Sequence, residues 1–478
     1  MTSHQMFRPL RPDGSSTMAA GSARRRTGSS RPRPRSAPGV GCGPDERGSP
    51  MRDIVRESAA AGRLVVWEES ARDGAQAKTL MPGGFRVRLA REHGAVFGAD
   101  GPRHVVFAAG FPAVCAEEFE AVRQVAVETE GQVSAAAVCR GTEADVRQAV
   151  ASVRGVAHAR VLAVVPASEA MARVMTHRGA REALAHGTDL VKTARDLDED
   201  VAIDLCLADA SRADHGLMAE AAGGFTAAGA GTVVLADTVG RQLPGEAAEM
   251  FARVAAAAGP GVVLGSHLHN DLGLGLANTV QAVRNGARVV ASSWLGLAER
   301  SGLVATEQLL FLLAHDPERA AALLGADARA AELWWRAPDL TRLPRIAALV
   351  SEQTGVPLTV TTPVVGTGVA TISTGTPFVD PRLFQPYDPT ALLGVEPRIV
   401  LTQLASARVV TAVAERLGHR LDAAGARAAA AWVKRRAFRT GEAVVDEELF
   451  AAYLDGVGVA RTTTSTITTT TSTAEDTP

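Results

Sequence analysis

The chain alternates short runs of β-branched and other apolar residues with longer stretches in which alanine, arginine and glutamate recur at helical spacing. Short continuous apolar runs bounded by turn residues are typical of strands that are buried on both faces, whereas apolar positions at intervals of three and four are typical of amphipathic helices. This pattern predicts eight strands, at residues 64–68, 104–108, 133–138, 160–165, 201–207, 232–236, 262–266 and 288–292.

Helical patterns separate these strands, among them residues 116–128, 143–153, 215–228, 244–258 and 274–285. Strands that alternate with helices form a parallel sheet with crossover helices. Eight such units close into a (β/α)8 or TIM barrel, so we expect an α/β fold with this barrel over residues 60–315. An open doubly wound sheet is the alternative, but no GxGxxG follows the first strand, which disfavours the dinucleotide-binding form of that sheet.

The pattern changes on both sides of the predicted barrel. Residues 1–55 are rich in Arg, Pro, Gly and Ser and contain too few apolar residues to pack, which predicts a disordered arm. Residues 316–460 predict a linker and a small helical subdomain, and residues 461–478 predict a disordered, threonine-rich tail. Helical patterns after the barrel strands occur at residues 305–313, 319–349, 401–417, 422–435 and 446–453.

The composition is that of a folded, soluble protein, with 46% hydrophobic residues in a chain of 478. A net charge of −2 gives no reason to expect nucleic acid or a membrane surface as a partner. The four cysteines (Cys42, Cys115, Cys139 and Cys206) lack CxxC spacing, which argues against a zinc ribbon or a disulfide scaffold. No apolar run approaches the roughly 20 residues of a membrane span, and the N-terminus lacks the apolar segment of a secretory signal. We therefore expect a cytoplasmic protein.

Two histidines follow the seventh predicted strand, and no other two of the eleven histidines are this close in sequence. Because successive side chains of a strand alternate between its faces, His267 and His269 project from the same side. An Asn270-Asp271 pair follows where the strand should turn into a loop. This strand end can offer a metal two nitrogen ligands; the alternative is a hydrogen-bonded pair of imidazoles at the rim.

A second polar cluster, which includes Arg72 and Asp73, follows the first predicted strand. In a parallel barrel both clusters would lie at the C-terminal rim, where such barrels carry their chemistry. Asp73 could then join His267 and His269 in an O,N,N donor set that suits Mg²⁺, Mn²⁺, Fe²⁺ or Zn²⁺. Arg72 keeps its proton at any useful pH, so at such a site it would stabilise negative charge on an oxygen. The alternative for Arg72 and Asp73 is a surface salt bridge.

Six motifs occur in an order that resembles a family of metal-dependent acyltransferases, the 2-isopropylmalate, homocitrate and citramalate synthases. The motifs are Arg72-Asp73-Gly74-Ala75-Gln76, Gly110-Phe111-Pro112, Asp209-Ala210-Ser211-Arg212, Asp237-Thr238-Val239-Gly240, His267-Leu268-His269-Asn270-Asp271-Leu272-Gly273 and Glu299-Arg300-Ser301-Gly302. Relatives of these synthases include the 3-hydroxy-3-methylglutaryl-CoA lyases and the pyruvate-carboxyltransferase-type domains. The resemblance covers roughly residues 64–418.

The resemblance implies a Claisen-type condensation in which the methyl group of acetyl-CoA, once deprotonated, attacks the keto carbon of a 2-oxo acid. It implies that a divalent metal (Mg, Mn or Zn) is held by Asp73, His267 and His269, and that the enzyme is a homodimer. In the same way it implies roles for five further residues: Arg72 stabilises the enolate or alkoxide, Glu299 is a candidate base, and Gln76, Arg212 and Thr238 surround the 2-oxo acid. Alternative readings leave Gln76 as a helix cap, Arg212 as an exposed helix residue, Thr238 as a turn residue and Glu299 as the buried partner of Arg300.

The sequence departs from the family pattern at several polar positions. Ala108 and Ala208 stand where glutamates are usual, and Leu303 stands where an asparagine is usual. Thr376-Pro377 replaces a histidine that the family uses to activate acetyl-CoA, and neither residue can act as a base.

Two other functions therefore stay open beside the synthase. One is a metal-dependent lyase or aldolase of the same superfamily, although the cysteine that the lyases use is missing from residues 294–306. The other is a catalytically degenerate paralogue that binds a metabolite or a partner. The retention of Arg72, Asp73 and the histidine pair argues against degeneration. In a protein that had lost its activity, mutations should also have replaced metal ligands.

Overall fold

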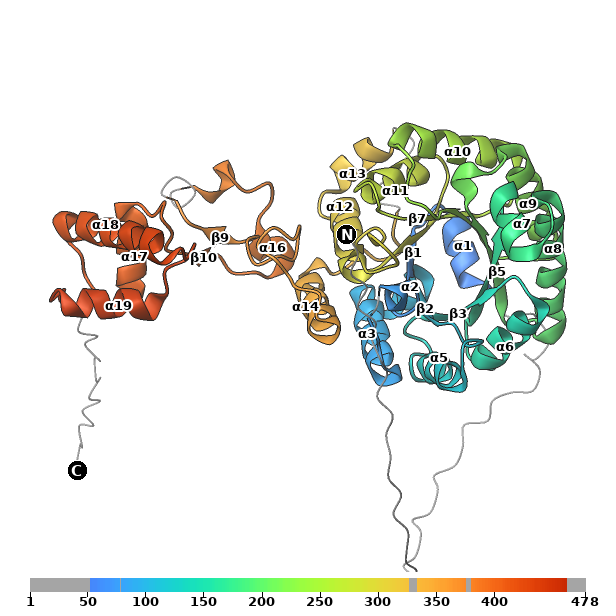
Figure 1. The fold of residues 1–478 in the computed structure, drawn as a ribbon, viewed down its shortest axis with the longest axis horizontal. Helices are drawn as coiled ribbons and strands as arrows, with labels where there is room; N and C mark the ends of the chain where they lie inside the picture. Colours follow the sequence, from blue (N-terminus) through green and yellow to red (C-terminus); the bar gives the residue numbers. More distant parts are fainter. Residues whose placement is uncertain (1–51, 78, 326–332, 375–379, 462–478) are drawn as a thin grey trace, which may run out of the picture. The chain divides into compact units, whose positions relative to one another are not determined.

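The structure is a computed structural model that describes residues 52–77, 79–325, 333–374 and 380–461. Eight parallel strands follow one another in chain order around a closed barrel, and β1 pairs with both β2 and β8 (Figure 1). The strands are β1 (Val65–Glu68), β2 (Val105–Gly110), β3 (Ser134–Arg140), β4 (Arg160–Pro166), β5 (Ala202–Ala208), β6 (Val233–Asp237), β7 (Leu264–Leu268) and β8 (Val289–Ser292). The predicted (β/α)8 barrel is confirmed, and each predicted strand ends within two residues of the observed one.

The strands are apolar throughout because both of their faces are covered. Along β3, for example, Ala135, Ala137 and Cys139 belong to the core between the strands and the outer helices. Ala136 and Val138 belong instead to the core inside the barrel. This alternation decides which side chains can reach the interior of the barrel at its rim.

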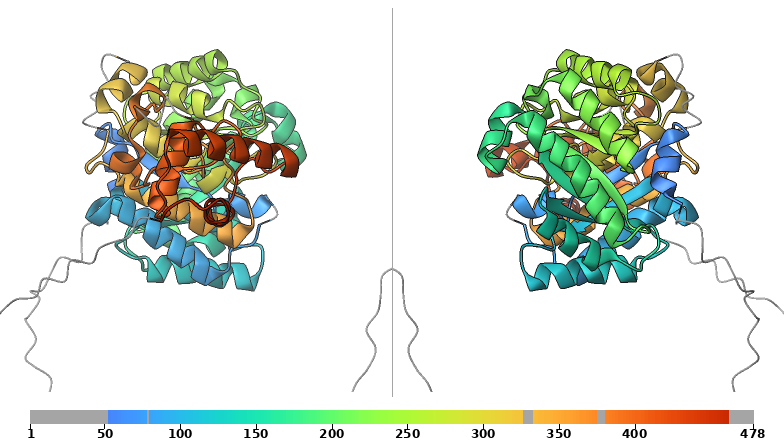
Figure 2. Two further views of the ribbon diagram at one scale, coloured as in Figure 1. Left: turned by 90° about the vertical axis from the view of Figure 1, so that its left-hand side faces the viewer. Right: turned by 90° about the vertical axis from the view of Figure 1, so that its right-hand side faces the viewer.

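The outer helices form where the amphipathic pattern predicts them. Helices α5 (Ala116–Glu128), α6 (Glu143–Val153) and α9 (His215–Ala228) have the predicted bounds, and α10 (Pro244–Ala257) and α11 (Gly275–Arg284) differ by one residue at one or both ends. Further helices of this layer are α3 (Gly83–Val96), α7 (Glu169–Thr176), α8 (Ala180–Leu197), α12 (Thr306–Ala314) and α13 (Pro317–Leu324), and the short α4 (Gly101–His104) precedes β2 and contacts α1. Helices α8, α9 and α10 pack side by side on the outside of the strands (Figure 2, right, green).

Helix α1 (Ile54–Ala60) packs against the interior of the barrel through Val55 and Ala59, and Figure 1 shows it inside the ring of strands. It is attached to the N-terminal ends of the strands, because Asp53, its N-cap, forms an ion pair with Arg160, the first residue of β4. Arg160 is buried and also binds Asp204 through two nitrogens, at 2.9 and 2.7 Å. The α1 segment therefore closes this end of the barrel.

The described chain beyond α13 contains two further groups of elements. The first comprises α14 (Leu343–Thr354), α16 (Pro389–Leu393) and a two-stranded parallel sheet of β9 (Thr371–Ile372) and β10 (Arg398–Ile399). The second comprises α17 (Ala407–Arg416), α18 (Ala423–Thr440) and α19 (Glu447–Gly456), which share a separate hydrophobic core. In the described ranges, no helix has the length and apolar character needed to cross a membrane.

Several sequence-based expectations fall on residues that the structure does not describe. Most of the predicted arm and almost all of the threonine-rich tail lie outside the described ranges, as do Cys42 and Thr376-Pro377. Helix α1 begins at Ile54, at the predicted end of the arm.

Candidate metal centre at the barrel rim

The turn after β1 places Asp73 at the C-terminal rim. The backbone carbonyl of Glu69 accepts hydrogen bonds from the N–H groups of Arg72, Asp73 and Gly74, at 3.0, 2.8 and 3.1 Å. This tight turn starts the short helix α2 (Asp73–Gln76), and Asp73 is its first residue. Its carboxylate is therefore held at the mouth of the barrel, close to where the strand ends.

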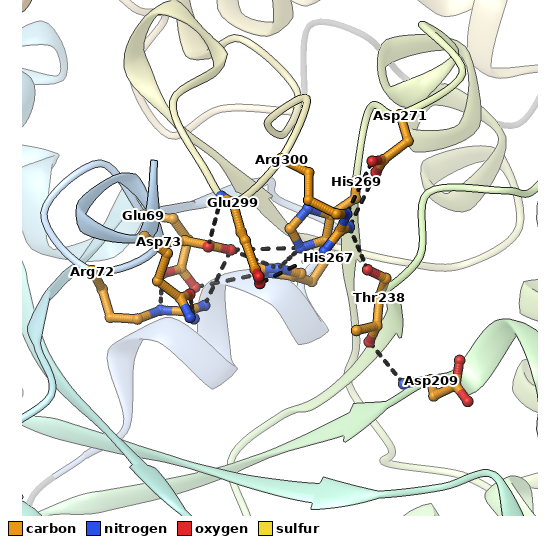
Figure 3. Close-up of polar contacts among 11 residues, drawn as sticks. Glu69, Arg72, Asp73, Asp209, Thr238, His267, His269, Asp271, Glu299 and Arg300 are labelled. Carbon is orange, nitrogen blue, oxygen red and sulfur yellow. Dashed lines mark hydrogen bonds and ion pairs between the residues drawn. The ribbon is translucent and has the colours of Figure 1, made fainter. Parts of the chain in front are cut away.

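Asp73, His267 and His269 converge on one point, as Figure 3 shows. Asp73 Oδ2 lies 3.3 Å from His267 Nε2 and 3.6 Å from His269 Nε2. The two Nε2 atoms are 3.3 Å apart, and all three side chains are buried. The histidines come from β7 and the residue after it, so the structure brings together three residues that the sequence separates by about two hundred positions.

This donor set fits a single divalent cation. Nitrogen and oxygen ligands lie at about 2.0–2.2 Å from zinc, which puts two ligands about 3.0 Å apart at a right angle and about 3.4 Å apart at a tetrahedral angle. The separations between the three donor atoms are close to these values. Burial and the neighbouring His267 lower the pKa of His269 to about 4, so at neutral pH this imidazole keeps a lone pair for a metal.

Charged neighbours set the ionisation of Arg72 and Asp73. Burial opposes charge on Arg72, but the carboxylates of Glu69 and Asp73 raise its pKa above the usual value. Burial also acts to raise the pKa of Asp73, but Arg72 and the two imidazoles hold it well below the usual range. Asp73 is therefore an anion and Arg72 a cation at any physiological pH.

The loop between β8 and α12 turns sharply next to Asp73. Leu295 and Arg300 have φ angles of 57° and 58°, in the left-handed region. Gly302 also has a positive φ, and a Cβ there would lie 2.0 Å from the carbonyl oxygen of Gly296. Its own carbonyl accepts a 2.8 Å hydrogen bond from the N–H of Asn270. Glycine at position 302 thus lets the loop close against itself and against the turn after β7.

This loop carries Glu299 and Arg300 to the candidate metal centre. The backbone N–H of Glu299 donates a 3.2 Å hydrogen bond to Asp73 Oδ1, whereas its carboxylate is 51% exposed and lies 3.6 Å from Arg300. Arg300 binds Asp271 at 2.9 and 3.1 Å and the carbonyl oxygen of Thr238 at 2.6 Å. Glu299 is therefore not the buried partner of Arg300; Asp271 is the closer partner.

The other predicted site residues lie at the same rim with partners of their own. The hydroxyl of Thr238 accepts a 2.8 Å hydrogen bond from the N–H of Asp209 (Figure 3). Arg212 donates to the Asp209 carboxylate at 2.7 Å and is 44% exposed. Gln76 is exposed and accepts a 3.5 Å contact from Arg72. One connected group of contacts therefore contains Arg72, Asp73, Gln76, both histidines and the backbone of Glu299. Thr238 is connected to this group through Arg300, which binds the Thr238 carbonyl oxygen and lies 3.6 Å from the Glu299 carboxylate.

Three acidic residues of this site were not predicted from the sequence. Glu69 binds Arg72, Asp271 binds Arg300, and Asp209 binds both Thr238 and Arg212. Glu69 carried a readable signal, since it follows Val65 and Trp67 at alternate positions and these two face the barrel interior. The pairings of Asp271 and Asp209 depend on left-handed residues and strand ends, which the sequence pattern does not reveal.

The three departures from the family pattern that the structure describes are all buried. Ala108 and Ala208 have the interior-facing parity of β2 and β5, as Val106 and Cys206 do, and Leu303 is 1% exposed. Apolar side chains therefore occupy these positions at or near the rim.

A family model described as HMGL-like matches residues 103–350, slightly more than half of the chain. The chain belongs to the HMGL-like family. Among curated relatives of this HMGL-like chain, 2-isopropylmalate synthase of Syntrophus aciditrophicus (strain SB) is 31% identical over 255 residues, or 52% of this chain and 48% of that protein. The 2-isopropylmalate synthase of Neisseria gonorrhoeae (strain ATCC 700825 / FA 1090) is 30% identical over 315 residues, or 65% of this chain and 49% of that protein. The resemblance inferred from the six motifs is confirmed.

The HMGL-like chain spans about half the length of these curated relatives. Among solved structures, the HMG-CoA lyase from Brucella melitensis superimposes with a TM-score of 0.48 at 19% identity and covers 61% of this chain and 99% of that one.

Proposed function

We propose that this protein is a metal-dependent acyltransferase that condenses acetyl-CoA with a 2-oxo acid. The observation that carries the proposal is the convergence of Asp73, His267 and His269 beside Arg72 at the rim of an HMGL-like barrel. Two imidazoles and one carboxylate favour Mn²⁺ or Zn²⁺ over Mg²⁺, which prefers oxygen ligands. A divalent ion held there would supply Lewis-acid polarisation of the substrate carbonyl.

Arg72 would stabilise the oxygen anion that develops during the condensation. Its guanidinium is held by Glu69 Oε2 at 2.7 Å and lies 3.8 Å from Asp73 Oδ2, so its position is fixed before substrate binds. A preorganised cation of this kind acts on charge that appears in the transition state. Arg72 also borders a cavity of about 630 Å³ with apolar walls at Leu80 and Val114. This cavity supports binding of a long, partly apolar thioester such as acetyl-CoA.

Glu299 is the residue we propose as the base. Its N–H is anchored to Asp73 while its carboxylate remains half exposed, so it is next to the metal centre and reachable by a substrate. It would take a proton from the methyl group of acetyl-CoA. The resulting enolate carbon would bond to the keto carbon of the 2-oxo acid, and water would then cleave the thioester and release CoA. Arg300, at 3.6 Å, would hold the carboxylate in place.

The interior of the barrel supports a 2-oxo acid with an apolar side chain. The residues that face inwards at the ends of β2 to β5 include Ala108, Val138, Val164 and Ala208. Two arginines lie near the ends of these strands, and each already has a carboxylate partner. Arg140 binds Asp145 at 2.6 Å, and Arg212 binds Asp209 at 2.7 Å. A second carboxylate on the substrate would be desolvated there without a free counter-charge, which is costly.

The test incubates the full chain with Mn²⁺ or Zn²⁺, acetyl-CoA and a panel of 2-oxo acids, and follows free thiol and product mass. We expect CoA release with apolar monocarboxylic acids such as 2-oxoisovalerate and little with 2-oxoglutarate. His267→Ala is the matched inactive control. Absence of thiol release with every acid would exclude the synthase.

A degenerate, metabolite-binding protein is the second candidate, and the apolar Ala108, Ala208 and Leu303 favour it. Such a protein would bind a 2-oxo acid in a metal-dependent way without releasing thiol. Calorimetric titration with the acid, run beside the thiol assay, separates the two functions.

A further inference from the structure

Glu69 is a fully buried carboxylate that lies between Arg72 and His267 (Figure 3). Its Oε2 atom accepts a 2.7 Å hydrogen bond from Arg72 Nε. Its Oε1 atom lies 3.7 Å from Nδ1 of His267, and in the described part of the chain this oxygen has no hydrogen-bond partner. One half of the carboxylate is thus satisfied and the other half faces the back of a candidate metal ligand.

Burying half of a carboxylate without a partner is costly, so its retention calls for a physical explanation. Arg72 does not remove the cost, because its guanidinium is shared with Asp73, 3.8 Å away. The neighbouring Glu68 is also half satisfied: its Oε1 accepts hydrogen bonds from both the N–H and the hydroxyl of Ser70, and its Oε2 has no hydrogen-bond partner among the described residues. What distinguishes Glu69 is that the ring of a candidate metal ligand, His267, lies 3.7 Å from its unpartnered oxygen.

The two histidines of the centre are held differently. His267 directs Nε2 at Asp73 and His269 and directs Nδ1 at Glu69. His269 also directs Nε2 at Asp73, but its Nδ1 is buried with no hydrogen-bond partner among the described residues. An imidazole that binds a metal through one nitrogen is usually oriented by a carboxylate or carbonyl on the other. Only His267 of this pair has a carboxylate in that position.

We propose that Glu69 is a positioning residue that orients His267 for metal binding and at the same time fixes Arg72. With the Nδ1 proton of His267 directed at Glu69, the lone pair on Nε2 is free for a cation. The negative charge of Glu69 also raises the electron density of the imidazole, which strengthens it as a ligand. This inference rests on the metal centre of the proposed function.

The experiment compares metal binding by the full chain and by Glu69→Gln, after chelation of bound metal and titration with Co²⁺, whose absorption spectrum reports the ligand field. The amide keeps the size of the side chain and an acceptor for Arg72 but loses the charge. We expect the Co²⁺ affinity to fall roughly 10- to 100-fold and the spectrum to shift. Glu68→Gln is the control, because this buried neighbour binds Ser70 rather than His267, and its affinity should equal that of the wild type.

The outcomes separate this inference from the function it rests on. If the wild type binds Co²⁺ and Glu69→Gln binds it with the same affinity and spectrum, Glu69 has no positioning role although the metal centre stands. If the wild type binds no ion, the metal centre, the proposed function and this inference all fall. Should Glu69→Gln fail to fold, Glu69→Asp keeps the charge but withdraws it from His267, and an unchanged Co²⁺ affinity in that variant would also overturn the proposal.

Discussion

The two ends of the barrel both bury charged side chains, but they complete their hydrogen bonds differently. At the N-terminal end, every side-chain nitrogen of Arg160 and both oxygens of Asp204 have a partner, supplied by each other, Asp53 and Thr232. At the C-terminal rim, the described residues leave Oε1 of Glu69 and Nδ1 of His269 without one. The cluster at the N-terminal end is satisfied by partners within the protein. At the rim, the potential metal ligands Asp73, His267 and His269 converge on one point beside these unpartnered atoms.

This difference separates architecture from chemistry. A buried ion pair whose atoms are all satisfied fixes neighbouring elements in place, here α1 against the ends of β4 and β5. A buried group that lacks a partner costs free energy, and such groups collect at sites that bind something else. Changes in the first cluster should therefore affect stability, and changes in the second should affect binding.

The largest expected effect is at the N-terminal end, in Asp204→Ala. This change leaves Arg160 buried with only Asp53 opposite it, and removal of one partner of a buried pair typically destabilises a protein by about 3–5 kcal/mol. We expect that loss in the free energy of unfolding in urea, with the Co²⁺ affinity of the folded protein unchanged. Asp204→Asn, which keeps the shape, should lose less. A loss below about 1 kcal/mol for Asp204→Ala would contradict the structural role of this cluster.

The next effect is at the rim, in Arg72→Lys. Lysine keeps a positive charge but cannot reproduce the Nε contact with Glu69, so the charge is no longer fixed in position. We expect kcat with the preferred 2-oxo acid to fall about 100-fold, the scale seen when one stabilising donor is removed. Metal affinity should stay close to that of the wild type. Activity within a factor of three of the wild type would show that Arg72 does not act on the reacting oxygen.

The smallest effect concerns Glu307, a buried carboxylate outside both clusters. Burial raises its pKa from 4.5 to about 7, and the N–H of Leu295 donates to one oxygen at 3.1 Å. Because the folded pKa is the higher one, its contribution to stability is full below pH 4.5 and is lost as pH rises to about 7. Glu307→Gln should therefore gain stability relative to the wild type between pH 5 and 8, by about 2.5 kcal/mol. Urea unfolding of both proteins at pH 5 and at pH 8 checks this. The prediction is refuted if the difference in the free energy of unfolding between variant and wild type is the same at the two pH values.

Much of the barrel could be predicted because its determinants are local. Helix α6 starts after Thr142, whose hydroxyl accepts from the N–H of Asp145, and α9 starts after Asp214, whose carboxylate accepts from the N–H of Leu217. These caps and the amphipathic pattern are visible in the sequence, and the bounds of both helices were predicted correctly. Helix α1 was not predicted, because it has only seven residues. Its buried side chains pack against the barrel interior, which is built from strands that follow it in the sequence.

The candidate site could be predicted only as far as spacing allows. The alternation of strand side chains placed His267 and His269 on one face, and the barrel placed Asp73 at the same rim. The contacts that the sequence did not reveal join residues far apart in the chain, such as Glu69 with His267 and Arg300 with Thr238. Such contacts depend on which strand ends become neighbours around the rim, and the local sequence pattern does not show this.

The most direct test of the account is a Co²⁺ titration of the metal-free full chain beside His267→Ala and His269→Ala, with Asp204→Asn as a control at the other end of the barrel. We predict that the wild type and the control bind one ion per chain with the same absorption spectrum. Each histidine variant should lose that binding, while its free energy of unfolding without metal changes little. An ion bound equally well by His267→Ala, or no ion bound by the wild type, would contradict the account.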